Sequence, residues 1–171
     1  ACEVYGATHA NVRPLSGENC TNIVIHAVLP QGGTFYHLAM EDGGHFAAAS
    51  VADRLTKDRH LLPCDPSHGG LDLDACAIAF AAHPPDVIYL DASMMLRPHP
   101  IRALRDLVGE HPIIVYDASQ VFGLLAGGLF QDPLAEGADL LSGSTHKSLP
   151  GPQKGMILTR RADLMGRIEA T

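Results

Sequence analysis

The sequence predicts an α/β fold with three layers, in which a mostly parallel sheet is covered by helices on both faces. The expected strands are short and continuously apolar rather than alternating, which is typical of strands buried on both sides. Segments with helical periodicity separate them, as parallel connections require. Polar residues follow the strands at their carboxyl ends, which is where ligands bind in such sheets.

The first half of the chain predicts alternating helices and strands. Ser16 is a good N-cap for an apolar-periodic helix that runs to residue 29, and the turn at 30–33 ends it. A strand is expected at 34–38, and Gly43-Gly44-His45 opens a helix that runs to about 53. A short strand is expected at 60–63. The amphipathic run 71–82 is a helix with acidic residues in its first turn, where the helix dipole favours them.

The second half repeats the pattern with more strongly apolar strands. The run 87–90 is a continuous apolar strand, and 100–108 is a helix that starts at a proline. The run 112–116 is another buried strand, and it ends at Asp117. Strands are also expected at 139–141 and 156–158, and a helix at 162–170.

The composition describes an ordinary folded domain. The chain has 171 residues, of which 46% are hydrophobic and 18% charged, enough for one domain with a real core. A net charge of −7 argues against a surface that binds nucleic acid. No apolar run has the length of a membrane span, and no signal peptide is visible. The four cysteines lack close paired spacing, so we expect small core residues in a reducing, cytoplasmic protein without a metal site.

The segment 144–152 carries the most specific chemistry, because it holds Lys147 between small hydroxyl residues and a Pro-Gly-Pro turn. An apolar run, 138–143, comes before it and is expected to bury the lysine at a strand end. Burial favours the neutral form of an amine, which can attack a carbonyl to form a Schiff base. That is the chemistry of a lysine that binds pyridoxal phosphate (PLP). The alternative is a lysine in an exposed loop, and this segment alone does not decide between them.

A PLP site also needs a carboxylate against the pyridine nitrogen and a group that stacks on the ring. Asp117 fits the first requirement, since it ends the most apolar strand; the alternative is an aspartate that caps the following turn. His45 fits the second, because Gly43-Gly44 lets the backbone approach a planar ligand closely. The alternative is a histidine that simply starts a helix.

The phosphate of PLP needs a cradle of hydrogen-bond donors. Ser16-Gly17-Glu18 begins a helix, where free N–H groups and the helix dipole attract a dianion. The commoner use of such a sequence is a plain N-cap. Ser93 and Gln120 follow strands and are candidate donors to the ring oxygen, although each type is also common in turns. The shared position of these residues at strand ends favours a cofactor site.

The segments 5–17, 38–45, 115–124 and 144–152 resemble the matching segments of serine hydroxymethyltransferase, and the spacing between them also fits. The resemblance covers nearly the whole chain. It implies the large PLP-binding domain of a fold-type I enzyme, with Lys147 as the Schiff-base lysine, Asp117 as the pyridinium partner and His45 stacked on the ring. It further implies that Ser93 contacts the ring oxygen, and that His146 precedes the lysine as in the family. Ser16 and Gly17 hold the phosphate in this reading.

The sequence departs from the family at informative positions. Glu18 replaces a second serine in the phosphate loop, where a carboxylate repels the phosphate unless it points away. Asp42 and Gln120 replace histidines, and Gln153 replaces an arginine. The Asp117–Gln120 pair is similar to cysteine desulfurases. These differences place the chain off the main hydroxymethyltransferase line, near a threonine transaldolase type.

The resemblance implies a PLP-dependent enzyme of amino-acid metabolism that makes or breaks the Cα–Cβ bond of a β-hydroxy amino acid. Its substrates are small, of the glycine-plus-aldehyde type, and tetrahydrofolate is left open as a co-substrate. A homodimer with a shared site is also implied. The alternatives are a desulfurase or β-eliminating lyase, although no cysteine follows Cys76, and a non-catalytic scaffold of the same fold.

The ends of the chain suggest a piece of a longer protein. It begins without methionine and stops inside the helix expected at 162–170. We therefore expect residues 1–171 to be an incomplete large domain that lacks an N-terminal segment and a C-terminal small domain. The family takes site residues from both of these parts, so we expect the piece alone to be a poor catalyst.

Overall fold

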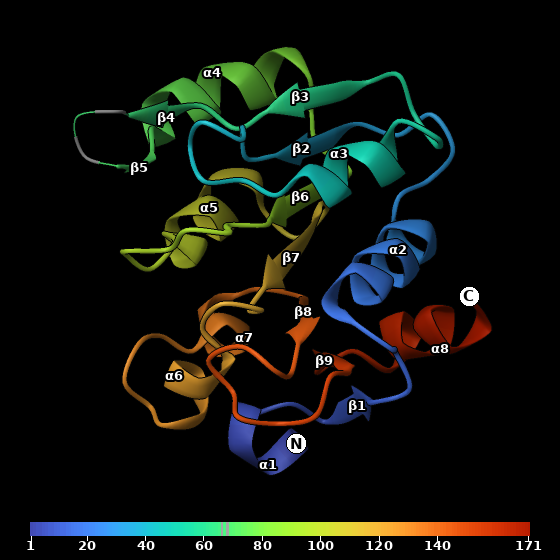
Figure 1. Ribbon diagram of the computed structural model, residues 1–171. Helices are drawn as coiled ribbons and strands as arrows, with labels where there is room; N and C mark the ends of the chain where they lie inside the picture. The colour runs from blue at the N-terminus through green and yellow to red at the C-terminus, as the bar shows by residue number, and fades with distance from the viewer. Residues whose placement is uncertain (66, 68) are drawn as a thin grey trace.

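The computed structural model describes residues 1–65, 67 and 69–171 (Figure 1). Its central sheet has seven strands in the order β1-β9-β8-β7-β6-β2-β3. Their bounds are β1 (His9–Asn11), β2 (Phe35–His37), β3 (Arg59–Leu61), β6 (Val87–Leu90), β7 (Ile113–Asp117), β8 (Leu140–Ser144) and β9 (Gly155–Thr159). Strands β3, β2, β6, β7 and β8 are parallel, whereas β9 pairs antiparallel with both β8 and β1. A small hairpin, β4 (Cys64–Asp65) and β5 (Gly70–Leu71), stands apart.

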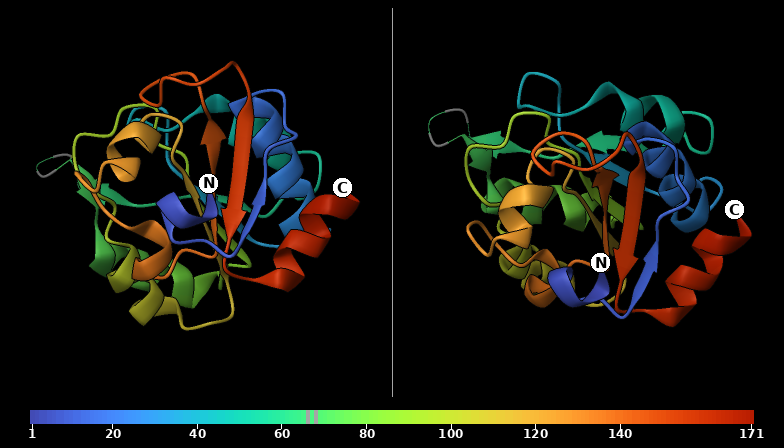
Figure 2. Two further views of the ribbon diagram at one scale, coloured as in Figure 1. Left: turned by 90° about the horizontal axis from the view of Figure 1, so that it is seen from below. Right: turned by 60° about the horizontal axis from the view of Figure 1, so that its bottom comes forward.

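Helices cover both faces of this sheet (Figure 2). One layer contains α2 (Gly17–Val28), α3 (Phe46–Ala52) and α8 (Ala162–Ala170). The other contains α1 (Cys2–Tyr5), α4 (Leu73–Ala82), α5 (Ile101–Val108), α6 (Phe122–Ala126) and α7 (Pro133–Glu136). The expected three-layer α/β fold is therefore confirmed.

The central strands are apolar throughout because neighbouring residues face different layers. In β6, Ile88 packs in the cluster with α4 and α5, and Tyr89 packs in the cluster with α2 and α3. In β7, Tyr116 and Val115 divide in the same way. All four of these side chains are fully buried. Alternate side chains of a strand point to opposite faces, so burial on both faces requires an unbroken apolar run.

Capping residues in the sequence lie at the N-termini of three helices in the structure. The Ser16 hydroxyl accepts a hydrogen bond from the backbone N–H of Asn19 at the start of α2. Asp72 caps α4 in the same way through the N–H of Ala75, and His45 precedes α3. The strand expected at 60–63 lies slightly earlier, at β3, and the strand expected at 139–141 continues to Ser144.

Several short elements were not predicted: β1, the β4–β5 hairpin, and the helices α1, α6 and α7. Each is two to five residues long, too short for a periodic pattern. The antiparallel direction of β9 is also unexpected, since a buried strand reads as apolar in either direction. Among the residues that the structure describes, no helix is both long and apolar enough to cross a bilayer.

Candidate active site

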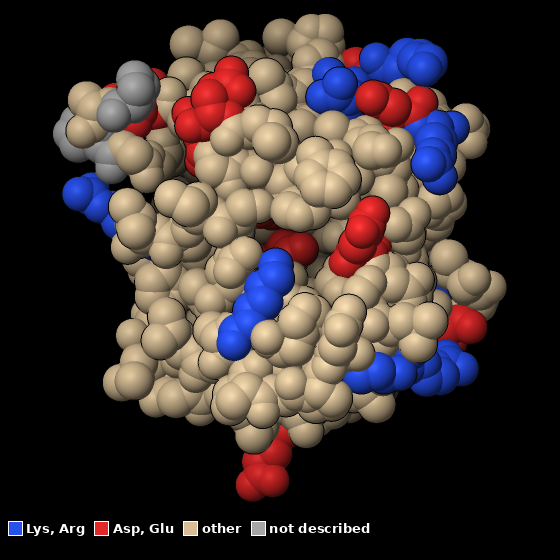
Figure 3. Space-filling view, in the orientation of Figure 1, with Lys and Arg blue, Asp and Glu red and all other residues tan. Residues whose placement is uncertain are grey.

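The carboxyl ends of β6, β7 and β8 face the first turns of α2 and α3 across a cavity of about 320 Å³. Figure 3 shows this face hollowed at its centre, with acidic surface at the bottom of the hollow and charged side chains at its rim. Every site residue predicted from the sequence lines this cavity. They are Ser16, Gly17, Glu18, His45, Ser93, Asp117, Gln120, His146 and Lys147.

Asp117 is the last residue of β7 and is held by the turn that follows. The backbone N–H of Ser119 donates to its Oδ1 at 2.8 Å, and the Ser119 hydroxyl accepts from the N–H of Ser144 at 2.9 Å. Gly143 makes this approach possible. A Cβ there would lie 2.6 Å from the Ser119 nitrogen and 2.9 Å from Asp117 Oδ1, at a φ of +146°. Ser119 and Gly143 therefore fix the position of one Asp117 carboxylate oxygen at the wall of the cavity.

Burial raises the pKa of Asp117 above its usual value, because a charged carboxylate loses its hydration there. The hydrogen bonds from Ser119 oppose this effect, as do the charges of Lys147 and His45. These electrostatic contributions place the lysine and the histidine near the carboxylate. A cation bound beside Asp117 would be favoured, because it would offset the cost of burying the carboxylate charge.

Lys147 itself is exposed, and its expected burial at a strand end is wrong. The strand β8 ends at Ser144, and the next residues leave the sheet in a turn that is closed by the hydrogen bond from Gly151 N–H to the Thr145 carbonyl. The turn carries the lysine to the rim of the cavity. Lys147 and Asp117 line the same cavity, and the charge of Lys147 opposes the rise in the pKa of Asp117.

His45 is fixed through both its backbone and its ring. Its Nδ1 accepts from the N–H of Ala47 at 3.2 Å, which leaves Nε2 to carry the proton of the neutral ring. Its backbone N–H donates at 3.1 Å to Asp91, whose other oxygen accepts from Leu38 N–H at 3.3 Å. Asp91 is only 2% exposed, and burial raises its pKa to about 7. Asp91 therefore positions the histidine over the cavity.

The first turn of α2 forms another wall of the cavity. The Ser16 hydroxyl is already engaged as the cap, so its backbone neighbours offer the free donors of this helix end. A Cβ at Gly17 would lie 3.0 Å from Ser144, so glycine lets the helix end approach β8 closely. Glu18 is exposed at the rim. The Ser144 hydroxyl is buried and has no partner among the described residues, which suits a polar ligand.

The remaining predicted residues lie around the opening. Ser93 and Gln120 are partly buried, and the Ser93 N–H donates to the Gly43 carbonyl at 2.6 Å. His146 is exposed beside Lys147. Their positions agree with contacts to a ligand, and their roles stay predictions.

Seven other residues of the cavity wall were not among the predicted site residues. They are Thr21, Phe46, Asp91, Ala92, Ser119, Ser144 and Gln153. Asp91 and Ser144 had a signal, since each stands at the end of a strand. Phe46, which is 58% exposed, had none, because an aromatic residue after an N-cap usually packs into the core.

The donor set of this cavity fits PLP. It combines the Lys147 amine, the buried Asp117 carboxylate, the N-terminus of α2 and the buried Ser144 hydroxyl, which has no partner among the described residues. The volume also lies in the range of small-molecule sites, about 300–1,000 Å³. An α/β sheet with such a cavity at its carboxyl edge is the arrangement expected of a fold-type I PLP-dependent enzyme.

Comparisons with known proteins agree with this class. Residues 1–167 match the family model described as serine hydroxymethyltransferase, and the chain belongs to that family. The serine hydroxymethyltransferase of Methanocella arvoryzae is 40% identical over 163 residues, which is 94% of this chain and 38% of the relative. The fluorothreonine transaldolase of Streptantibioticus cattleyicolor is 37% identical over 168 residues, 98% of this chain and 26% of that protein.

A solved structure gives the same result in three dimensions. The L-threonine transaldolase of Pseudomonas fluorescens, in its internal aldimine state, matches with a TM-score of 0.90 and 32% identity. The match covers 98% of this chain and 40% of that one. The chain thus spans about two fifths of the length of the first relatives that it matches.

Proposed function

We propose that this chain is the PLP-binding large domain of an enzyme that makes or breaks the Cα–Cβ bond of a β-hydroxy amino acid. The single observation that carries the proposal is the meeting of Lys147, Asp117, His45 and the α2 N-terminus around one cavity. Hydroxymethyltransferase and transaldolase relatives support this reaction class. PLP, when bound, supplies an electron-accepting ring for the bond cleavage.

The chain's residues divide the work of holding this cofactor. Lys147 binds its aldehyde carbon through the amine, and His146 lies beside it at the rim. The N–H groups that begin α2, at Gly17 and Glu18, bind the phosphate together with the dipole of this helix. The Ser16 hydroxyl supports them by capping the turn. Ser93 and Gln120 donate to the ring oxygen.

Asp117 and His45 set the electronic state and orientation of the ring. Asp117 would hold a proton on the pyridine nitrogen, since it is a buried carboxylate that lines the cavity. His45 stacks on the ring, and Asp91 fixes the backbone from which it projects. Both residues act on the cofactor rather than on the amino acid.

PLP titration tests the cofactor proposal directly. The chain is mixed with PLP, and the visible absorption band of lysine-bound PLP is recorded. We expect a saturable band in the wild type and none in Lys147→Ala. Lys57→Ala removes an exposed lysine that does not line the cavity and serves as the matched control. A band that persists in Lys147→Ala would overturn the assignment of this lysine. No band in the wild type would favour a non-catalytic scaffold.

The reaction class is tested with the PLP-loaded protein. Glycine, serine, threonine and cysteine are added separately, and aldehyde and sulfide products are measured. The proposal predicts aldehyde release from threonine or serine, with turnover that increases when the rest of the protein is present. Sulfide from cysteine would instead favour the desulfurase alternative, which Gln120 supports. Dependence of the serine reaction on tetrahydrofolate separates a hydroxymethyltransferase from a transaldolase.

We further propose that the protein works as a cytoplasmic homodimer in which the two subunits share the site. Phe46 lines the cavity and is 58% exposed, and Leu15, close to the phosphate-binding turn, is 69% exposed. Large apolar side chains around an open site favour cover by another surface. Sedimentation of the full protein at several concentrations tests this, and a monomer at all concentrations would contradict it.

A further inference from the structure

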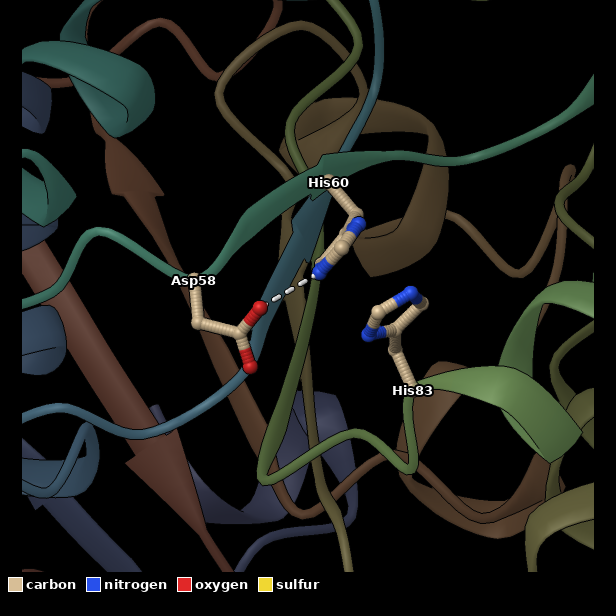
Figure 4. A group of neighbouring side chains, drawn as sticks. All are labelled: Asp58, His60 and His83. Atoms are coloured by element: carbon tan, nitrogen blue, oxygen red, sulfur yellow. Dashed lines mark hydrogen bonds and ion pairs between the residues drawn. The ribbon is translucent and has the colours of Figure 1, made fainter.

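Two histidines and an aspartate lie close together beside the edge strand β3 and the C-terminus of α4, outside the candidate active site. Asp58 precedes β3, His60 lies within β3, and His83 is the C-cap residue of α4 (Figure 4). One ligand-type atom from each side chain lies within 4.8 Å of those of the other two. None of the three residues lines the 320 Å³ cavity.

Neighbouring side chains hold this group in place. The Thr34 hydroxyl donates to Asp58 Oδ2 at 2.6 Å, which directs Oδ1 toward His60 Nε2 at 2.7 Å. The Tyr36 ring stacks on the His60 ring with centroids 5.0 Å apart. The Tyr36 hydroxyl also lies 3.1 Å from the His83 carbonyl, so one tyrosine supports both histidines. The supports come from β2 and do not depend on the group itself.

Some of the nitrogen and oxygen atoms of Asp58, His60 and His83 that could bind a metal form no hydrogen bond with a described residue. The ring centroids of His60 and His83 lie 4.4 Å apart, with 31° between the ring planes. Figure 4 shows the two histidines side by side, with Asp58 next to His60. Asp58 is paired with His60, and no described residue hydrogen-bonds the His83 ring. A cation between the three side chains would take one ligand atom from each of them. Outer supports such as Thr34 on Asp58 are typical of metal ligands.

We propose that Asp58, His60 and His83 bind a zinc-type divalent transition-metal ion. Two imidazole nitrogens and one carboxylate oxygen suit Zn²⁺, with a water molecule as the fourth ligand. Metal–ligand bonds of about 2.0–2.2 Å put tetrahedral ligands about 3.3 Å apart. The Asp58–His60 contact must therefore lengthen by about half an ångström, and the exposed His83 side chain is free to adjust its rotamer.

The ion would tie the edge strand β3 to the end of α4. It thereby closes the segment between Asp58 and His83, which includes the β4–β5 hairpin. A ligand that binds only the folded chain stabilises it by mass action. Because the group is separate from the cavity, metal binding leaves the PLP site unchanged. The cysteine pattern gave no hint of this site, since its ligands are histidines and an aspartate spread over two elements.

Zinc titration of the purified chain tests the proposal. Binding of ZnCl₂ is followed by isothermal titration and by competition with a chromogenic chelator at pH 7.5. We expect one tight equivalent in the wild type and a loss of about 100-fold in affinity in His83→Ala. His83 is exposed, so this variant should keep its fold, which circular dichroism checks. His111→Ala removes an exposed histidine elsewhere and should bind like the wild type.

A second variant and two readouts make the result decisive. Asp58→Asn keeps the side-chain size and should also weaken zinc binding, whereas His45→Ala, in the cavity, should not. Zinc should raise the unfolding midpoint of the wild type but not that of His83→Ala. Equal zinc affinity in wild type and His83→Ala would overturn the proposal, as would loss of binding in His45→Ala alone. No zinc binding up to millimolar concentration would overturn it too.

Discussion

The carboxylates of the cavity and the carboxylate at the sheet edge differ in how the fold treats their charge. Burial raises the pKa values of Asp117 and Asp91, and the charge of Asp117 raises the pKa of Asp91 further. Asp58, next to β3, has a lowered pKa, because Thr34 and His60 hydrogen-bond it in an accessible position. The edge carboxylate is already supplied with partners. The cavity carboxylates accept backbone hydrogen bonds but form no ion pair among the described residues, and shifted pKa values of this kind cluster at functional sites.

The largest effect is expected when one carboxylate charge is removed from the cavity and, in a separate variant, one from the sheet edge. Asp117→Asn should weaken PLP binding by about 2–5 kcal/mol, because the ring nitrogen loses its buried ionic partner. The same change should not destabilise the cofactor-free chain, since it removes a desolvated charge. Asp58→Asn should do the reverse, with unchanged PLP affinity and a small loss of stability. PLP titration measures the cofactor affinity of both variants, and urea unfolding measures their stability. If the two variants changed PLP affinity and stability in the same way, the contrast between the two regions would be wrong.

A comparable effect is expected from the glycine that lets Asp117 sit where it does. Gly143→Ala should destabilise the chain by about 3 kcal/mol, because its Cβ would collide with the Ser119 backbone at an unfavourable φ. Gly69→Ala also has a positive φ, of +64°, but its Cβ would meet nothing within 4 Å. It is the control for backbone strain alone. Urea midpoints that fall equally in both variants would contradict the packing argument.

The pH dependence of stability sharpens the contrast further. Asp91 has a folded pKa of about 7 against an unfolded value near 3.8, so the folded chain holds more protons between these values. Stability should therefore fall as pH rises from 4 to 7, by about 3–4 kcal/mol from this residue. Burial lowers the pKa values of His37 and His99 to about 4, and they act in the opposite direction. The readout is thus the difference between wild type and Asp91→Asn.

Urea unfolding at several pH values isolates this contribution. The stability of Asp91→Asn relative to the wild type should increase as pH rises from 4 to 7 and should stay constant above about 8. A difference that does not change with pH would show that Asp91 titrates as an ordinary exposed acid. His111→Ala, which changes an exposed histidine, controls for nonspecific charge effects.

The smallest effect concerns the exposed acid at the phosphate-binding turn. Glu18→Ser should tighten PLP binding by about three- to tenfold, because a negative charge near the phosphate is removed. The cofactor-free chain should become slightly less stable, since an acid in the first turn favours α2. PLP titration at low and high salt measures both the gain and its electrostatic origin. Equal affinity at low salt would mean that Glu18 points away from the phosphate.

Much of the site was predictable because its residues stand at strand ends and helix starts. Once the strands at 87–90 and 113–117 are assigned, parallel pairing brings Ser93 and Asp117 to the same edge. The capping pattern at Ser16 places a helix N-terminus there as well. The exposure of Lys147 was not predictable, because the path of the turn after β8 depends on contacts between Thr145 and residues several positions later.

The sequence by itself determined the family, the alternation of helices and strands that predicts a mostly parallel sheet, and the chemical identity of the cavity residues. These follow from short-range patterns: apolar runs, caps and the residues beside them. Tertiary structure alone decided that β9 runs antiparallel, that Asp91 fixes His45, and that His83 meets Asp58 and His60. Each of these contacts joins segments at least 20 residues apart or depends on strand direction, and no local pattern encodes such a distance.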